Sequence, residues 1–231
     1  ARTGKRRRLR PTGEKLAAGG FQTPSARLLT RRNTEACHFC GSEYGDEANP
    51  IVFCDRCDVP VHMYCYGIDE LPPGDMPWYC DACRLPESLR PNAAYPPCAL
   101  CPTPWGALRI LGPSSVNTIP RHAMLHKGVG DSTPRFVHSA CVASVPEAFC
   151  HIDREEGCHF YFGDITRVPS ERYDLLCGLC KIPHGAPAQC SAKGCYVEMH
   201  PLCARNAGLA CEFDPNGTLH VFCETHSMAR H

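Results

Sequence analysis

Apolar residues occur along this chain in short runs that are interrupted by polar residues, glycine and proline. The runs at 51–53, 107–111 and 135–138 predict strands, and the Gly-, Pro-, Ser- and Asn-rich residues 112–134 predict a loop between the last two. Residues 146–165 predict a hairpin. No apolar run approaches the roughly 20 residues that cross a bilayer, so we expect no membrane span.

The composition does not suit an ordinary pair of hydrophobic cores. The 231 residues include 22 Pro, 19 Gly and 19 Cys, and 8% are aromatic. Cysteine at this density is typical of a secreted disulfide framework or of bound metal. The chain opens with basic residues and no apolar stretch behind them, so we expect no secretory signal.

The cysteines come in C-x-x-C pairs, and histidine recurs three residues before cysteine. The pairs begin at Cys37, Cys54, Cys80, Cys98 and Cys177, and the histidines are His62, His138 and His200. Thiolates beside imidazole are the ligands of tetrahedral zinc, whereas a disulfide network has no use for the histidines. We therefore predict bound zinc.

The first eight candidate ligands are four Cys, one His and three Cys in order. Neighbouring pairs could close the sites in sequence, but the alternating long and short gaps favour a cross-brace, in which alternate pairs share an ion. The cross-brace assigns one zinc to Cys37, Cys40, His62 and Cys65, and a second to Cys54, Cys57, Cys80 and Cys83. Each ion then ties distant segments together in a domain with little apolar core.

Two further modules follow a proline-rich link. Cys98, Cys101, His138 and Cys141 predict one knuckle-type site. The cross-brace logic then assigns one zinc to Cys177, Cys180, His200 and Cys203, and another to Cys190, Cys195, Cys223 and His226. All five predicted zincs have four protein ligands, so none keeps the open position of a catalytic zinc.

Three cysteines remain outside these groups: Cys150, Cys158 and Cys211. We interpret them as buried, inert thiols. Cys150-His151 and Cys158-His159 could form a further zinc site, but they fall within the predicted hairpin, whose expected core is Phe149, Ile152, Phe160 and Phe162.

The formal net charge of zero hides a division along the chain. Residues 1–32 carry ten Lys or Arg and one acid, Glu14, whereas the remainder is acidic. We expect this arm to be disordered in isolation and to serve as a solvated tail, a nuclear-import signal or a contact with DNA phosphates. The candidate DNA-binding residues are Arg6, Arg7, Arg8 and Arg10, because residues 170–231 carry no excess of positive charge.

The first module contains the sequence Ile51-Val52-Phe53-Cys54-Asp55-Arg56-Cys57, the run His62-x-x-Cys65-Tyr66-Gly67, and Trp78 two residues before Cys80. These features resemble a PHD finger. A RING finger of a ubiquitin ligase uses the same cross-brace, but its single His usually stands at the fourth ligand, which here is Cys57.

The later modules contain Cys98-Ala99-Leu100-Cys101-Pro102, Val145-Pro146-Glu147, and Val168-Pro169 leading through Arg172 to Leu176-Cys177. Together the three modules resemble the PZP module of bromodomain-and-PHD-finger and Jade-like chromatin proteins. The resemblance implies a small zinc-stabilised α+β fold with two cross-brace PHD-type fingers joined by a zinc knuckle, and five structural zincs. It divides the chain into an arm at 1–34, a PHD finger at 35–86, a knuckle with a long inserted loop at 96–145, a bridging hairpin at 146–176 and an extended PHD finger at 177–228.

The resemblance also implies a binding mode, in which the N-terminal tail of histone H3 adds as an antiparallel strand to the first finger. Ile51, Val52 and Phe53 would be the pairing strand. The free amino group of the tail would meet the turn that contains Gly74 before Trp78, and its arginine at the second position would reach Asp55 or Asp58. The lysine at the fourth position would face Glu43, Asp46 or Glu47.

The state of that lysine follows from the residues around it. Readers of trimethyl-lysine commonly carry Trp two residues before the His ligand, where this chain has Pro60. We therefore expect a preference for the unmodified lysine. The alternative interpretation of Glu43, Asp46 and Glu47 is a solvated acidic loop.

No nucleophile elbow, phosphate loop or paired-carboxylate motif occurs in the sequence, so we expect neither an enzyme nor a small-molecule substrate. The favoured function is a nuclear reader of the nucleosome that recruits a histone-modifying complex. The alternative is a structural scaffold without histone recognition. The residues Ala1-Arg2-Thr3 match the start of histone H3, which indicates a histone mimic, a designed terminus or chance.

Overall fold

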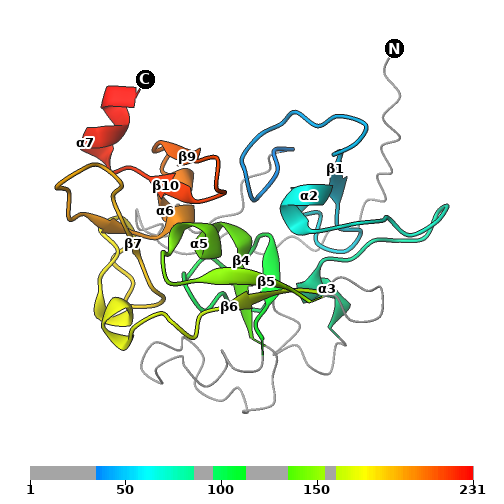
Figure 1. Cartoon of the computed structure of the whole chain (residues 1–231), viewed down its shortest axis with the longest axis horizontal. Helices are drawn as coiled ribbons and strands as arrows, with labels where there is room; N and C mark the ends of the chain where they lie inside the picture. The colour runs from blue at the N-terminus through cyan, green and yellow to red at the C-terminus, as the bar shows by residue number, and fades with distance from the viewer. Residues whose placement is uncertain (1–34, 86–95, 113–134, 154–159, 231) are drawn as a thin grey trace, which may run out of the picture.

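The computed structural model describes residues 35–85, 96–112, 135–153 and 160–230 (Figure 1). The strands are β1 (Ile51–Phe53), β2 (Pro60–His62), β3 (Leu108–Ile110), β4 (Phe136–His138), β5 (Phe149–Asp153), β6 (Phe160–Asp164), β7 (Ala188–Gln189), β8 (Glu198–Met199), β9 (Cys211–Phe213) and β10 (Leu219–Val221). The helices are α2 (Met63–Tyr66), α3 (Asp81–Arg84), α5 (Ser139–Ser144), α6 (Pro201–Asn206) and α7 (Glu224–Ser227), with 3-10 turns η4 (Ser170–Asp174) and η5 (Met228–Arg230).

The described strands form five two-stranded antiparallel sheets, each made of strands that follow one another in sequence. The first finger holds β1 and β2, the knuckle holds β3 and β4, and the extended finger holds the β7–β8 and β9–β10 pairs. This small zinc-binding architecture is the predicted fold class. The strands predicted at 107–111 and 135–138 and the hairpin predicted at 146–165 are present as β3, β4 and β5–β6.

One local unit is repeated in all three modules. The helices α2, α5 and α6 each begin directly after a histidine, and His62, His138 and His200 occupy the capping position with extended backbone angles. The next candidate ligand lies in the first turn of each helix. A histidine followed three residues later by cysteine therefore places both side chains at the same end of a short helix, ready to converge on one ion.

The hairpin β5–β6 is attached to the knuckle. Gly112 donates its N–H to the carbonyl of Gly163 at 3.0 Å, and an added Cβ at Gly163 would lie 2.4 Å from Cγ1 of Val137. Only glycine allows this approach. Of the four residues predicted as the hairpin core, Phe149 is partly buried, and the side chains of the other three lie outside the description.

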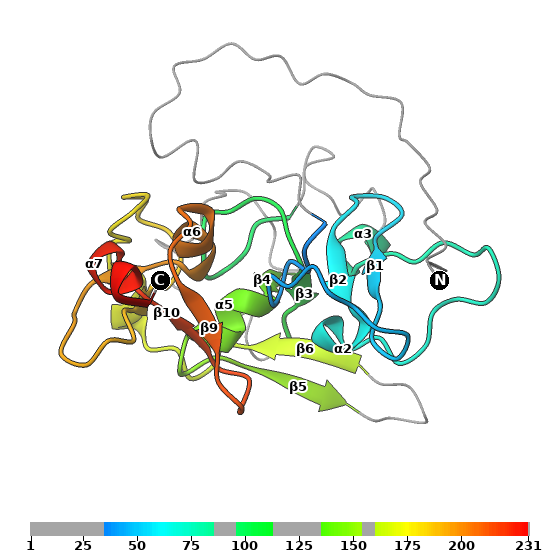
Figure 2. The same cartoon turned by 90° about the horizontal axis from the view of Figure 1, so that it is seen from above.

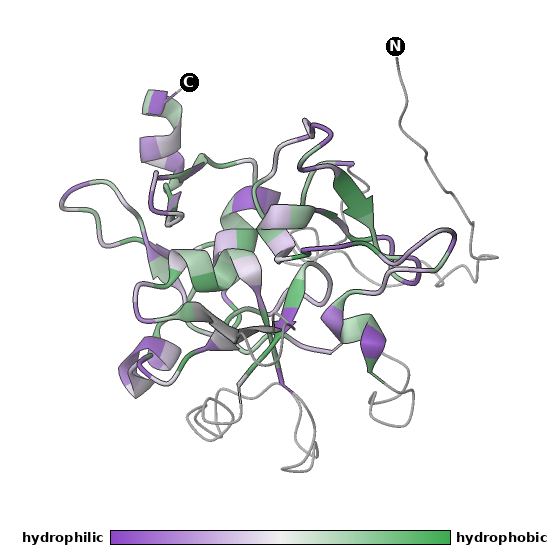
Figure 3. Cartoon of the chain, turned by 45° about the vertical axis from the view of Figure 1, so that its right-hand side comes forward, coloured by the Kyte–Doolittle hydropathy of each residue, from purple (hydrophilic) through white to green (hydrophobic). Residues whose placement is uncertain are grey.

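A single cluster of buried apolar residues runs through all three modules and includes many candidate zinc ligands. Its fully buried members include Leu100, Leu108, Phe136, Ile165, Leu202 and Leu219. Hydrophilic and hydrophobic residues are interspersed along the described parts of the ribbon (Figure 3). Among the described helices, none has the length and apolar character needed to cross a membrane.

Candidate metal centres and an open strand edge

The structure gathers the candidate ligands into five groups of four, with the donor atoms of each group within 4.8 Å of one another. The groups are site 1 (Cys37, Cys40, His62, Cys65), site 2 (Cys54, Cys57, Cys80, Cys83), site 3 (Cys98, Cys101, His138, Cys141), site 4 (Cys177, Cys180, His200, Cys203) and site 5 (Cys190, Cys195, Cys223, His226). Both fingers thus adopt the cross-brace rather than closing neighbouring pairs.

The histidines are oriented for metal binding through Nδ1. In site 1, Nδ1 of His62 lies 3.3 Å from Sγ of Cys40, while its Nε2 lies 2.8 Å from the carbonyl oxygen of Tyr44. The Nε2–H can donate to that carbonyl, which leaves the lone pair of Nδ1 facing the thiols. In sites 3 and 4, Nδ1 of His138 and His200 also faces cysteine sulfur.

The first cysteine of every group accepts a hydrogen bond from the backbone N–H of the third ligand. These N–H to Sγ distances are 3.3 Å for His62 to Cys37, 3.4 Å for Cys80 to Cys54, 3.3 Å for His138 to Cys98, 3.4 Å for His200 to Cys177 and 3.3 Å for Cys223 to Cys190. An N–H donor stabilises a thiolate. All five groups therefore share one backbone device that favours ionised sulfur.

The pKa values of the site 1 thiols show that neighbouring thiolates repel one another when no cation is bound. Hydrogen bonds from Cys40 and Cys65 lower the pKa of Cys37, while interactions with Cys37 and Cys40 raise the pKa of Cys65. One thiol ionises readily and its neighbours hold their protons, because closely spaced thiolates repel. A divalent cation removes this repulsion and displaces the protons.

The donor sets fit structural zinc. Three or four thiolates, completed where needed by imidazole, make closed tetrahedral sites, and each site has four protein ligands. The chemistry that zinc supplies here is cross-linking of the chain, on the order of 10 kcal/mol or more per site by analogy with zinc-finger peptides.

The β1–β2 sheet of the first finger leaves one edge of β1 open. Ladder hydrogen bonds flank the Val52–Val61 pair, with Met63 N–H to Pro50 O at 3.2 Å and Cys54 N–H to Val59 O at 3.1 Å. Backbone groups alternate in direction along an antiparallel strand, so Val52 faces β2. The N–H and C=O groups of Ile51 and Phe53 therefore point to the other edge. Within the residues that the structure describes, β1 pairs with β2 alone.

The far side of β2 is already covered. His38 donates its N–H to the carbonyl of Pro60 at 2.7 Å, and Nδ1 of His38 accepts the N–H of Ala107 in the knuckle at 3.2 Å. In Figure 2, β2 lies between β1 and the knuckle strands. The open edge of β1 therefore faces away from the rest of the module.

Three of the predicted histone-facing residues are in an exposed loop before β1. Glu43, Asp46 and Glu47 are all exposed. Asp46 Oδ1 accepts the N–H groups of Ala48 and Asn49 at 3.0 and 2.7 Å, so this carboxylate also shapes its own turn. The other two, Glu43 and Glu47, are exposed to solvent in the same loop.

The remaining predicted contacts lie at the end of β1 and in the following turn. Asp55 and Asp58 are exposed, although Asp55 Oδ2 already accepts the N–H of Trp78 at 2.7 Å. Gly74 is exposed with φ +61, a conformation that favours glycine. The structure buries Trp78, which is 6% exposed and packs against Tyr66, so its indole supports the turn from within.

The corresponding strand of the extended finger, β7, has a different edge. Ala188 pairs with β8, and the next ladder bond runs from Cys190 N–H to Val197 O at 2.8 Å. By the same alternation, Pro187 and Gln189 face away from β8. Pro187 has no N–H to offer an added strand.

Residues of other modules form hydrogen bonds with the backbone around Pro187. Arg172 donates to the carbonyl of Pro187 at 3.2 Å and also pairs with Glu147 at 2.6 Å. Ala186 N–H donates to the carbonyl of Leu100 in the knuckle at 3.0 Å, and an added Cβ at Gly185 would lie 2.3 Å from that oxygen. Ala186 and Pro187, which lead into β7, are therefore held by other modules, whereas Gln189 of β7 is exposed.

A buried arginine that the sequence did not single out joins the first finger to the knuckle. Arg109 of β3 donates to the carbonyl of Tyr66, pairs with Asp81 at 3.1 Å and lies 4.0 Å above the Tyr66 ring. Tyr66 in turn donates its hydroxyl to the carbonyl of Leu108 at 2.5 Å. The available signal was a charged residue within an otherwise apolar strand.

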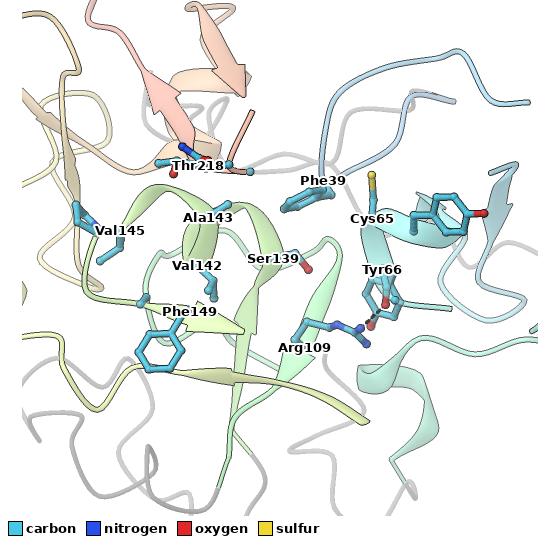
Figure 4. Close-up of a pocket in the computed structure, with 16 residues that line it drawn as sticks. Phe39, Cys65, Tyr66, Arg109, Ser139, Val142, Ala143, Val145, Phe149 and Thr218 are labelled. Carbon is cyan, nitrogen blue, oxygen red and sulfur yellow. Dashed lines mark hydrogen bonds between the residues drawn. The ribbon is translucent and has the colours of Figure 1, made fainter. Parts of the chain in front are cut away.

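The three modules meet at a pocket of about 430 Å³. Phe39 and Tyr66 of the first finger, Val142 and Phe149 of the middle of the chain and Thr218 of the extended finger contribute to its walls (Figure 4). The shape of this pocket therefore depends on how all three modules are held together.

Some predicted residues lie outside the description. Arg6, Arg7, Arg8 and Arg10 belong to residues 1–34, as does Ala1-Arg2-Thr3, and most of the predicted 112–134 loop is likewise not described. The suggested further site with Cys158 and His159 also falls there. Cys211 is partly buried and belongs to none of the five groups.

Comparisons with known proteins agree with this architecture. A PHD-finger family model matches residues 48–84, and a PHD-like zinc-binding domain model matches residues 138–227. The crystal structure of the zebrafish PHF14 PZP module superposes with a TM-score of 0.53, covering 83% of this chain and 88% of that one at 23% sequence identity.

Relatives are found among Jade proteins. Protein Jade-1 of Danio rerio is 34% identical over 75% of this chain, and the E3 ubiquitin-protein ligase Jade-2 of Homo sapiens is 32% identical over 83%. The match covers 17% and 21% of those proteins, respectively, so this chain spans a small part of their length. The PHD finger protein rhinoceros of Drosophila melanogaster is 30% identical over 84% of this chain.

The ligand groups, the matched domains and the shared fold lead to one conclusion. This chain carries a PZP module, in which a PHD finger, a zinc knuckle and an extended PHD finger follow one another, similar to the matching segments of Jade proteins.

Proposed function

We propose that this module reads the N-terminal tail of histone H3 on the first finger and prefers a tail whose fourth residue is an unmodified lysine. The tail adds as an antiparallel strand to β1, so that main-chain hydrogen bonds supply affinity and neighbouring side chains supply specificity. The module would act in the nucleus and bring a histone-modifying complex to nucleosomes.

The observation that carries the proposal is the open edge of β1. Ile51 and Phe53 direct two N–H and two C=O groups outward, and the covered side of β2 leaves no other edge in this sheet. Phe53 is 38% exposed, which offers an apolar surface beside the backbone groups. An extended peptide satisfies such an edge with regular hydrogen bonds.

The charge around the edge supports a cationic peptide. Glu43 and Glu47 are exposed in the loop before β1, and Asp58 is exposed after it. A protonated lysine amine donates three hydrogen bonds to carboxylates, and trimethylation removes all three donors. The preference for unmodified lysine follows from this difference.

The methylated form would instead need an aromatic enclosure. Pro60 occupies the position where trimethyl-lysine readers commonly carry Trp, and this proline is buried. Tyr44 is 90% exposed in the acidic loop, but one ring encloses a cation on one side only. The acidic residues therefore support the unmodified ligand more strongly.

We propose a binding role rather than an enzymatic one. All five donor groups have four protein ligands, which leaves no open coordination position for a substrate. The name of human Jade-2 assigns ubiquitin-ligase activity to that protein, but the ligand order of the first finger here follows a PHD rather than a RING pattern. A scaffold without histone recognition is the alternative, and it predicts no peptide binding.

Calorimetry tests the proposal directly. The zinc-loaded module is titrated with an H3 tail peptide in unmodified form and with trimethylated lysine at the fourth position, and a scrambled peptide serves as the control. We expect the unmodified peptide to bind more tightly. Equal or tighter binding of the trimethylated peptide would refute the preference, and binding of neither would favour the scaffold.

A further inference from the structure

The two residues between the first pair of ligands contact both other modules of the molecule. His38 and Phe39 lie between Cys37 and Cys40 of site 1. The His38 ring accepts the N–H of Ala107 and packs edge-on against Trp105 at 5.1 Å, both in the knuckle. The Phe39 ring packs 4.8 Å from Phe213 of the extended finger.

The backbone of the same two residues is held by an arginine from the far end of the chain. Arg205 lies in α6, two residues after the site 4 ligand Cys203. Its guanidinium donates to the carbonyl of His38 at 2.5 Å and to the carbonyl of Phe39 at 2.6 Å. One side chain thereby satisfies two carbonyls within the ligand loop of site 1.

The charge of Arg205 needs compensation. Burial lowers its pKa, and the thiols of Cys211, Cys37 and Cys40 oppose this shift. Within the part of the chain that the structure describes, no carboxylate forms an ion pair with it. Arg205 is partly buried and its hydrogen-bond partners are neutral carbonyls, so the charge that compensates the guanidinium has to come from other groups around it.

Site 1 provides that charge when zinc is bound. Three thiolates and a neutral imidazole around one Zn²⁺ leave a net charge of about −1 on the site. A guanidinium beside this group offsets its charge and fixes the loop that carries two of its ligands. Groups around a metal that orient its ligands strongly affect how tightly the metal is held.

We propose that Arg205 is a positioning residue for the first zinc site, through which the extended finger controls how firmly the histone-binding finger holds its metal. The ligand loop of site 1 borders β2 through the hydrogen bond from His38 to Pro60. Loss of Arg205 therefore loosens site 1 and, through β2, the strand pair that presents the open edge.

The test measures the reactivity of each cysteine in the zinc-loaded full chain. Wild type, Arg205→Gln, Arg205→Lys and the control Arg230→Gln are treated with N-ethylmaleimide, and modification of each cysteine is followed over time by mass spectrometry. Arg230 lies exposed in the same finger and pairs with Glu212, so the control removes the same charge elsewhere.

In Arg205→Gln we expect Cys37, Cys40 and Cys65 to react about 10- to 100-fold faster, as for other groups that support metal ligands. The site 2 cysteines should keep their rates, Arg230→Gln should match wild type at site 1, and Arg205→Lys should recover much of the protection because it keeps the charge. A zinc-competition titration should release one equivalent of zinc earlier than the rest.

Three results would overturn the proposal: unchanged rates at site 1, equal acceleration at sites 1 and 2, or no recovery with lysine. Where Arg205→Gln does not fold, Phe213→Leu replaces it. That change weakens the adjacent aromatic contact and keeps the guanidinium, so site 1 should stay protected. Exposure of its thiols in Phe213→Leu would assign the effect to packing alone and contradict the proposal.

Discussion

The two PHD-type fingers share a cross-brace and yet treat their strands in opposite ways. In the first finger, β1 presents the backbone groups of Ile51 and Phe53 to an open edge. In the extended finger, the equivalent edge of β7 begins with Pro187, whose carbonyl is occupied by Arg172. The same metal scaffold therefore leaves an open strand edge in one finger and ties the corresponding segment of the other to its neighbours.

In these two zinc fingers, metal coordination and the exposure of strand edges are therefore separate properties. Zinc fixes the path of the chain in both fingers, but it does not determine which edges remain available. Which groups remain available is set by neighbours from other modules, such as Arg172, which donates to the carbonyl of Pro187. Which strand edge stays open thus depends on how the modules pack together as well as on the finger itself.

Loss of a zinc ligand should have the largest effect, because both fingers depend on their zinc sites. Cys80→Ser should lose the site 2 zinc and unfold the first finger, because one ion contributes on the order of 10 kcal/mol. Peptide binding should disappear. The matched change Cys223→Ser at site 5 should unfold part of the extended finger while measurable peptide binding persists. Zinc counting and circular dichroism provide the structural readout, and loss of binding in both variants would contradict the division of roles.

Proline substitutions on the outer edges of β1 and β7 should affect peptide binding differently. Phe53→Pro removes an outward N–H from β1 without removing a bond to β2, and it should weaken peptide binding about tenfold or more, as loss of a hydrogen bond plus a steric clash requires. Gln189→Pro makes the same change on β7 and should leave peptide affinity as it was. Calorimetry on both variants decides; equal affinity of Phe53→Pro and wild type would remove β1 from the binding mode.

Uncovering the second edge should cost stability without creating a binding site. Arg172→Ala loses the contacts with Glu147 and Pro187 and should lower the free energy of unfolding by about 1 to 3 kcal/mol. The control Arg167→Ala removes an exposed side chain five residues earlier, which loses only a contact with the Phe149 ring, and it should change the free energy of unfolding by about 0.5 kcal/mol or less. Thermal unfolding measures both. A new peptide site on the extended finger in Arg172→Ala would show that Pro187 and Leu100 do not block it.

The smallest effect concerns the acidic loop. Glu43→Gln and Glu47→Gln should each weaken binding of the unmodified peptide about two- to fivefold, because exposed ion pairs contribute little and are screened by salt. Glu224→Gln in the extended finger is the matched control and should have no effect. If Glu43→Gln and Glu47→Gln bind the peptide as tightly as wild type even at low salt, the acidic loop is solvated and does not contact the peptide.

Much of this architecture was predictable from residue types and spacing. Pairs of Cys separated by two residues and His three before Cys predicted the five ligand groups, because tetrahedral zinc requires four such donors within reach of one another. The short apolar runs at 107–111 and 135–138 predicted the knuckle strands. The candidate ligands and the strands can be predicted because the spacing of Cys and His and the short apolar runs are visible in the sequence itself.

Contacts between modules could not be predicted in this way. Arg205 meets His38 and Phe39 more than 160 residues away in sequence, and Arg172 caps Pro187 across a turn between modules. Nothing in the local pattern distinguishes these arginines from exposed ones. Their roles follow from tertiary packing, which also decides that Trp78 is buried rather than displayed.

One finger offers an open strand edge and the other does not, and hydrogen exchange with and without the H3 peptide measures this difference residue by residue. We expect the amides of Ile51 and Phe53 to become protected when the peptide binds, that of Val52 to be protected already, and that of Gln189 not to change. Protection that appears along β7, or binding that leaves Ile51 and Phe53 as exposed as before, would contradict this expectation.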